Sequence, residues 1–169
     1  MATGKTTIGK RLSSKLNLPF FDSDREIELS LGSSINEYFK TYGESKFREI
    51  EEKIIIESIQ NNQNNNFIMS LGGGAYLNHN IRKLINLVGI SIWLNGNINL
   101  IYNRLKKSKN ERPLMDTFNT KEKLEKLLKE RMLYYQIADI KVNIIKTSKD
   151  NMSDIILNQI EEYVSIKDG

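Results

Sequence analysis

Three residues near the start of the chain, Gly4, Lys5 and Thr6, have the types and spacing of a phosphate-binding site. They match the second half of the loop pattern G-x-x-x-x-G-K-[ST], and residues typical of a helix follow directly. In such a loop, backbone N–H groups and the start of the helix surround phosphate oxygens, the lysine adds positive charge, and the hydroxyl binds Mg²⁺. We therefore expect a nucleotide and its magnesium ion to be held by Ala2, Thr3, Gly4, Lys5, Thr6 and Thr7.

Two carboxylates and two arginines are further candidates for chemistry. Asp22 and Asp24 follow the apolar segment 18–21. They form either a turn with a helix cap at Asp24 or a ligand site, because the carboxyl ends of parallel strands border the crevice where ligands bind. Arg48 and Arg131 lie in segments with helical periodicity. Each is either one more charge on a helix surface or a guanidinium fork for a carboxylate.

Glycines and a polar segment complete the candidate site. Gly72-Gly73-Gly74 follow a second apolar segment, 67–70, and favour a backbone that comes close to a ligand, although a flexible turn would also use them. The polar segment 107–120 contains Arg112 and is typical of a loop or of a lid that closes over a site.

Hydrophobic periodicity predicts the elements that position these residues. We expect helices over 5–16, 25–31, 44–59, 79–87, 97–106, 121–137 and 152–164, and a further helix that begins at Ser34, with Glu37 completing a capping box. Strands are expected over 18–21, 67–70, 89–94 and 140–145. This alternation predicts a three-layer α/β/α fold around a mostly parallel sheet, in one domain spanning residues 1–169.

Composition excludes several classes of protein. The chain has 169 residues, of which 39% are hydrophobic and 27% charged, and no apolar run approaches the ~20 residues needed to span a membrane. It contains no cysteine, which excludes disulfides and thiolate metal sites and favours a cytoplasmic location. The net charge is +4, but lysines alternate with glutamates, as over 121–126. We expect a monomer with no nucleic-acid or membrane partner.

Taken in order, the motifs resemble the shikimate kinase family over nearly the whole chain. They are Asp22-Ser23-Asp24, Phe47-Arg48-Glu49-Ile50-Glu51, Gly72-Gly73-Gly74-Ala75, Arg112-Pro113-Leu114 and Arg131-Met132-Leu133-Tyr134-Tyr135. The resemblance implies a P-loop kinase fold and the transfer of the γ-phosphoryl group of ATP to the 3-hydroxyl of shikimate. That reaction is a step towards the aromatic amino acids.

The same resemblance implies roles for individual residues. Asp24 would bind the shikimate hydroxyls and act as the base, and Asp22 would support Mg²⁺ together with Thr6. Arg48 and Arg131 would bind the shikimate carboxylate. The shikimate site would be lined by Gly72, Gly73 and Gly74, with Glu51 orienting Arg48. Arg112 would close over ATP and, with Lys5, stabilise charge on the transferred phosphoryl group. Arg104 would lie beside the adenine of ATP.

The loop pattern also predicts residues that the printed chain does not contain. Its first glycine would lie two positions before Met1, and the strand that feeds such a loop would lie before that glycine. We expect this first, central strand to be missing, because either the start codon lies upstream or the gene product is shortened. The alternatives are another small P-loop kinase, acting on gluconate or a nucleoside monophosphate, and a non-catalytic kinase-like protein.

Overall fold

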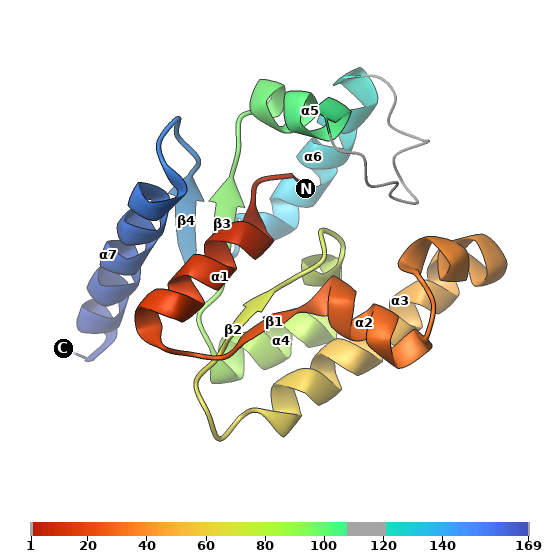
Figure 1. Ribbon diagram of the computed structural model, residues 1–169, viewed down its shortest axis with the longest axis horizontal. Coiled ribbons are helices and arrows are strands. Elements are labelled where there is room, and N and C mark those ends of the chain that lie inside the picture. The colour runs from red at the N-terminus through yellow and green to blue at the C-terminus, as the bar shows by residue number, and fades with distance from the viewer. Residues whose placement is uncertain (1, 108–120, 169) are drawn as a thin grey trace.

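The computed structural model describes residues 2–107 and 121–168, in which helices alternate with short parallel strands (Figure 1). The strands are β1 (Phe20–Asp22), β2 (Ile68–Ser70), β3 (Ile92–Asn95) and β4 (Ile140–Asn143). The helices are α1 (Lys5–Leu16), α2 (Ser23–Leu31), α3 (Ile35–Asn61), α4 (His79–Val88), α5 (Ile98–Lys107), α6 (Lys121–Tyr135) and α7 (Lys149–Asp168), with a short 3₁₀ helix, η1 (Ala75–Leu77).

The four strands form two parallel pairs. Strand β1 lies beside β2, with Phe20 opposite Ile68, and β3 lies beside β4, with Ile92 opposite Ile140. Within the described ranges, β2 pairs only with β1 and β3 only with β4. The predicted parallel strands are therefore confirmed, and they are arranged as two half-sheets whose inner edges are β2 and β3.

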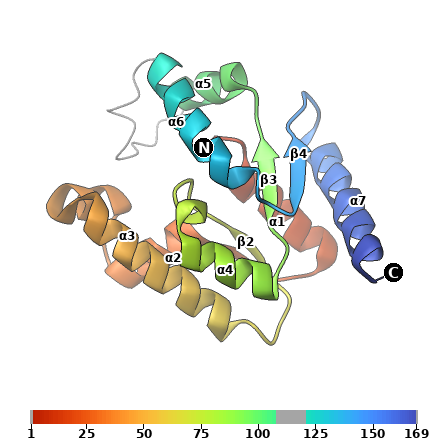
Figure 2. The same cartoon turned by 180° about the vertical axis from the view of Figure 1, so that it is seen from behind.

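Helices cover both faces of the half-sheets (Figures 1 and 2). On one face, α1 and α7 pack on the strands through a core that includes Ile8, Leu12, Val142 and Ile156. On the other face, α3, α4 and η1 enclose a second core that includes Ile55, Ile59, Ala75 and Ile81. These two helical layers with strands between them give the α/β/α arrangement that the alternation predicted.

Local capping explains where several helices begin and bend. Helix α3 has the predicted capping box, in which the Ser34 hydroxyl accepts from the Glu37 N–H and the Glu37 carboxylate accepts from the Ser34 N–H. Gly43 interrupts α3 with φ +79°, a conformation that favours glycine. Helix α7 begins at Lys149, three residues before the prediction, because the Ser148 hydroxyl accepts from the Asn151 N–H.

The predicted strands are longer than the observed ones. Strand β3 begins at Ile92 rather than at residue 89, and β4 ends at Asn143 rather than at 145. Sequence periodicity did not predict η1, which forms directly after the glycine loop. The two differences in strand length lie at element boundaries, where the hydrogen bonds of neighbouring loops, rather than hydrophobic periodicity, determine the backbone conformation.

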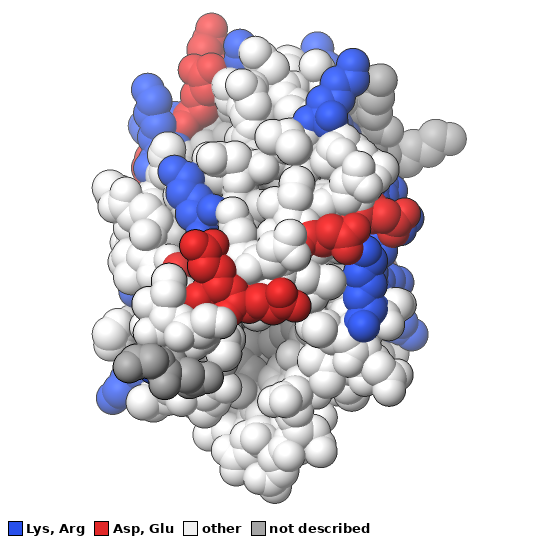
Figure 3. Space-filling view, turned by 90° about the vertical axis from the view of Figure 1, so that its left-hand side faces the viewer, with Lys and Arg blue, Asp and Glu red and all other residues white. Residues whose placement is uncertain are grey.

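The surface charge is mixed in sign. On the side of the molecule formed by α1 and α7, basic and acidic side chains are interspersed (Figure 3). Two ion pairs, Arg11 with Asp150 and Lys15 with Asp154, join these helices. None of the helices in the described part of the chain combines the length and apolar character needed to cross a membrane.

Candidate active site

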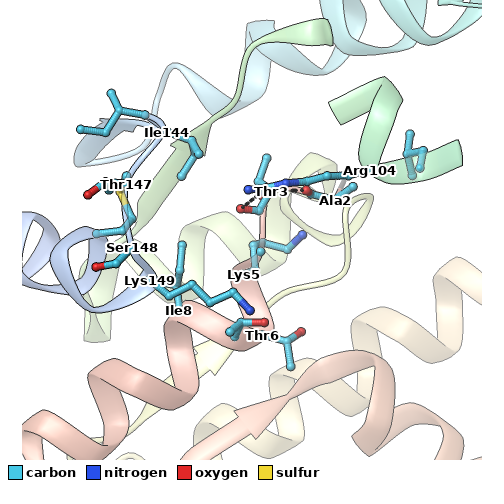
Figure 4. Close-up of a pocket in the computed structure, with 15 residues that line it drawn as sticks. Ala2, Thr3, Lys5, Thr6, Ile8, Arg104, Ile144, Thr147, Ser148 and Lys149 are labelled. Atoms are coloured by element: carbon cyan, nitrogen blue, oxygen red, sulfur yellow. Dashed lines mark hydrogen bonds between the residues drawn. The ribbon is translucent and has the colours of Figure 1, made fainter. Parts of the chain in front are cut away.

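The loop before α1 has the conformation of an anion site. Gly4 is the N-cap of α1 at φ +94°, and Ala2 also has a positive φ of +48°. The N–H groups at the start of the helix therefore face a cavity of about 390 Å³, which is lined by residues 2–8 (Figure 4). A helix N-terminus beside such a loop binds phosphate oxygens. The structure thus brings together Ala2, Thr3, Gly4, Lys5, Thr6 and Thr7.

The far wall of this cavity comes from two other parts of the chain. Arg104 of α5 donates from Nη1 to the carbonyl oxygens of Ala2 and Thr3, each at 3.2 Å, and so holds the loop in place. Thr147, Ser148 and Lys149, at the start of α7 and just before it, line the cavity from the opposite side (Figure 4). The sequence analysis named none of these three residues. A run of hydroxyl and lysine residues directly after the last strand was the available signal.

Thr6 and Asp22 form the contact expected of a magnesium site. The Thr6 hydroxyl donates to Oδ2 of Asp22 at 2.6 Å. Hydroxyl and carboxylate oxygens are ligands that Mg²⁺ accepts, and this ion is usually held by one or two protein groups together with substrate phosphates. No cluster of three or more His, Cys, Asp or Glu side chains suited to a metal occurs among the described residues. The pair therefore fits a magnesium ion that shares its ligands with a nucleotide.

The end of β1 is tied to the glycine loop. Asp22 is the N-cap of α2, and its Oδ1 accepts from the Asp24 N–H at 3.2 Å, so the helix cap lies at Asp22 rather than at Asp24. Ser23 is buried, and its hydroxyl accepts from the Gly72 N–H at 2.8 Å. A Cβ atom on Gly72 would lie 2.5 Å from Oδ1 of Asp24. Only glycine allows this close approach of backbone and carboxylate.

Arg48 is held by two carboxylates. Its Nη1 donates to Glu51 at 2.6 Å, and its Nε and Nη2 donate to Glu44 at 3.3 and 3.1 Å. The Glu51 side chain is only 4% exposed, whereas that of Arg48 is 29% exposed. A Cβ atom on Gly74 would lie 2.7 Å from Cζ of Arg48, so the guanidinium lies directly against the glycine loop.

Arg131 lies near the same loop on a different helix, α6. It is buried, and its Nε has no hydrogen-bond partner among the described residues. Tyr135, one turn later on α6, donates its hydroxyl to the carbonyl oxygen of Gly73 and interacts with Arg131. A buried guanidinium nitrogen without a partner carries a large desolvation cost, which an anionic ligand would remove. Sequence reasoning missed the part that Tyr135 plays.

The charges of this region follow from burial. Burial raises the pKa of the Glu51 carboxyl, although Arg48 acts in the opposite direction. For Arg48, burial disfavours the charged form, but the attraction and hydrogen bonds of Glu51 and Glu44 outweigh it and raise its pKa. Burial also raises the pKa of Tyr135, so its hydroxyl stays protonated and remains a hydrogen-bond donor.

The predicted residues thus lie in two neighbouring half-sites. The phosphate loop, Thr6 and Arg104 form one, and the other consists of Asp24, Arg48, Gly72, Gly73, Gly74 and Arg131. Asp22 lies between them, because its carboxylate contacts both Thr6 and the backbone of Asp24. The predicted lid residue Arg112 lies outside the described residues.

Comparison with known proteins points to one family. The family model "Shikimate kinase" matches residues 1–161. The shikimate kinase of Bartonella henselae is 39% identical over 97% of this chain and 76% of the relative, and that of Bartonella quintana is 37% identical over the same shares.

Solved structures agree with the sequence comparison. The shikimate kinase of Acinetobacter baumannii in complex with shikimate is 31% identical, with a TM-score of 0.88 over 96% of this chain and 89% of that one. The enzyme of Bacteroides thetaiotaomicron is 28% identical, with a TM-score of 0.82 over 95% of this chain and 94% of that one. Because the family model covers nearly the whole chain and the relatives named above are up to 39% identical to it, the chain belongs to the shikimate kinase family.

Proposed function

We propose that the chain transfers the γ-phosphoryl group of ATP to the 3-hydroxyl of shikimate, which gives shikimate 3-phosphate and ADP. The observation that carries this proposal is the meeting of two arginines at one glycine loop. Arg48 contacts the loop at Gly74, and Arg131 is connected to it through Tyr135 and Gly73. Two guanidinium groups around one small space suit a single carboxylate.

The carboxylate of shikimate would accept a hydrogen bond from the buried Nε of Arg131 and would also bind the guanidinium group of Arg48. Glu44 and Glu51 hold the Arg48 guanidinium in a fixed plane before the substrate arrives. This arrangement lowers the entropy that binding costs. The ring hydroxyls would then face Asp24, which would accept the proton of the attacking hydroxyl.

The phosphate loop would hold the donor. Backbone N–H groups at Gly4 and the start of α1 would bind phosphate oxygens, with Lys5 adding positive charge. Thr6 and Asp22 would hold Mg²⁺, which neutralises charge on the phosphates when it is bound. Positioning and electrostatics supply most of the catalysis in such a reaction, and the protein needs little covalent chemistry of its own.

We propose that Arg112 closes over ATP, that the chain acts as a monomer in the cytoplasm, and that shikimate and ATP are its main small-molecule partners. The alternation of lysines and glutamates over 121–126 supports the proposal that nucleic acid is not a partner, and the face shown in Figure 3 carries charges of both signs.

The direct test is ADP release from Mg-ATP by the purified chain. We expect ADP release only when shikimate is present. Neither gluconate nor a nucleoside monophosphate should replace shikimate in this assay. Asp24→Asn should lower kcat by about 10²- to 10⁴-fold, the range for loss of a general base. Asp154→Asn is the matched control, because this aspartate pairs with Lys15 on the outer surface. A folded chain that releases no ADP with shikimate would contradict the proposal and favour a non-catalytic kinase-like protein.

A further inference from the structure

The backbone carbonyl groups of residues 72–76, which span the glycine loop and the start of η1, all accept hydrogen bonds. Three of them accept from backbone N–H groups three residues later in the chain. The other two accept from side chains: the Tyr135 hydroxyl donates to Gly73, and Nη1 of Arg82 donates to Tyr76 at 2.8 Å. Side chains of two helices, α6 and α4, therefore hold this segment in place.

Arg82 has a second partner, which lies on α6. Its Cζ lies 5.0 Å from the centre of the Tyr134 ring, at the distance of a cation–π contact. Tyr134 directly precedes Tyr135 and follows Arg131 by three residues on the same helix. One guanidinium group thus joins α4, η1 and α6.

The elements that Arg82 joins are those that bring the two arginines of the carboxylate site together. The guanidinium of Arg48 lies against the glycine loop, since a Cβ atom on Gly74 would lie 2.7 Å from its Cζ. Arg131, with its buried Nε, belongs to α6. The spacing of these two guanidinium groups therefore depends on how the glycine loop and η1 lie relative to α6.

We propose that Arg82 is a positioning residue of the acceptor site, which fixes the glycine loop relative to α6 so that Arg48 and Arg131 bind one carboxylate together. This inference rests on the proposed function, with shikimate as the acceptor, and deepens it. Arg82 acts through the loop rather than by touching the substrate, because its guanidinium is engaged by the Tyr76 carbonyl and the Tyr134 ring. A misplacement of about 1 Å at such a site can cost about 100-fold in rate.

A general stabilising role is the competing explanation for the contacts of Arg82. A residue that only stabilises the fold would lower Tm when replaced, but it would leave the kinetic constants of the folded enzyme unchanged. A residue that positions the acceptor site changes the KM for shikimate and spares the KM for ATP. The two explanations therefore differ in which constant responds.

The kinetic test compares Arg82→Ala with Lys83→Ala, which changes the exposed neighbour on α4. Initial rates of ADP release are measured while shikimate is varied at saturating Mg-ATP, and then while Mg-ATP is varied at saturating shikimate. We expect Arg82→Ala to raise the KM for shikimate by about tenfold, as for the loss of one hydrogen bond to a charged group. The KM for ATP and kcat should stay within about twofold, and Lys83→Ala should change none of the three constants.

Two further variants test the route through Tyr134. Tyr134→Leu should raise the KM for shikimate by about two- to fivefold, the value of an exposed cation–π contact. When Arg82→Ala is already present, Tyr134→Leu should add nothing, because the two side chains act as one contact. Arg82→Lys keeps the charge and a donor but loses the planar guanidinium, so its KM should lie between those of the original chain and Arg82→Ala.

Amide hydrogen exchange gives a readout that needs no substrate. The N–H groups of Leu77 and Asn78 donate to Gly74 and Ala75 within η1. We expect Arg82→Ala to speed their exchange by about tenfold, because the carbonyl of the intervening segment loses its anchor to α4. Lys83→Ala should leave these exchange rates unchanged.

The outcomes separate this inference from the proposed function. If the original chain releases ADP with shikimate but Arg82→Ala leaves its KM unchanged, the positioning role is overturned and the proposed function stands. If the original chain releases no ADP with shikimate, the proposed function fails, and unchanged exchange in η1 would also overturn the hold of Arg82 on the loop. A lower Tm with an equal rise in both KM values would overturn the inference in favour of general stabilisation.

Discussion

Replacing Arg48 by lysine keeps the positive charge of the substrate site but removes its planar fork. In the structure, three guanidinium nitrogens are used: Nη1 donates to Glu51, and Nε and Nη2 donate to Glu44. A lysine ammonium can replace one of these contacts but cannot hold two carboxylates and also offer a bidentate face to a third. We therefore expect Arg48→Lys to weaken the binding of shikimate.

The size of the effect follows from the lost hydrogen bond. A hydrogen bond to a charged group contributes about 1.5–3 kcal/mol, and about 1.4 kcal/mol corresponds to a tenfold change in affinity. The KM for shikimate should therefore rise by about 10- to 150-fold. The substrate carboxylate is remote from the reacting hydroxyl and is bound equally in the ground state and the transition state, so kcat should change little.

The assay is the initial rate of ADP release over a range of shikimate concentrations at saturating Mg-ATP. A thermal melt of each variant is needed, because Glu51 is 4% exposed and depends on Arg48 for its main ion pair. Lys46→Ala is the matched control: Lys46 lies two residues earlier on α3, is 62% exposed and pairs with Glu49. A folded Arg48→Lys variant whose KM stays within about twofold of the original would refute the assigned role.

Three further changes test the rest of the acceptor site. Gly72→Ala should lower kcat by about 100-fold, because the added Cβ would lie 2.5 Å from Oδ1 of Asp24 and displace it; an unchanged kcat would contradict this. Tyr135→Phe removes the hydrogen bond to Gly73 and should raise the KM for shikimate by about 2- to 12-fold in the same assay, with kcat retained; a fall in kcat alone would exclude a positioning role. Burial raises the pKa of Glu51 above its ordinary 4.5. The contribution of Glu51 to the free energy of unfolding of the unsubstituted chain is therefore lost as the pH rises through that raised pKa. Urea unfolding should therefore show Glu51→Gln gaining stability relative to the unsubstituted chain as the pH rises above about 4.5, and a difference that does not change with pH would count against the buried charge.

The sequence predicted the element order well because hydrophobic periodicity decides it. Helix α1 was predicted with the bounds observed, the capping box at Ser34 is confirmed, and the predicted division into a helix from Ser34 and another from residue 44 matches the non-helical backbone of Gly43 inside α3. These features depend on neighbouring residues alone, which a sequence displays directly. The division of the strands into two pairs depends on contacts between distant segments, which periodicity does not report.

The sequence predicted which residues form the candidate site, but not which neighbouring side chains hold its glycine loop. Motifs identified Asp24, Arg48 and Arg131, since these types in this order are specific. Ser23 and Tyr135 were missed because serine and tyrosine are common in structural roles. Their importance arises from the hydrogen bonds to Gly72 and Gly73, and those glycines are distant in the sequence. The predicted lid, centred on Arg112, remains a prediction, as do the roles assigned to each residue.

A single carboxylate, that of Asp22, has a consequence for how the two substrates influence each other. One of its oxygens accepts from Thr6 and the other from the backbone of Asp24. A nucleotide whose metal ion bound the Thr6 hydroxyl would remove one of the two partners of Asp22, the residue that caps α2. Thermodynamic reciprocity requires that shikimate change the affinity for the nucleotide by the same factor by which the nucleotide changes the affinity for shikimate. Any coupling that runs through Asp22 should therefore appear equally in both affinities, and the order in which the two substrates are added should not alter the final complex.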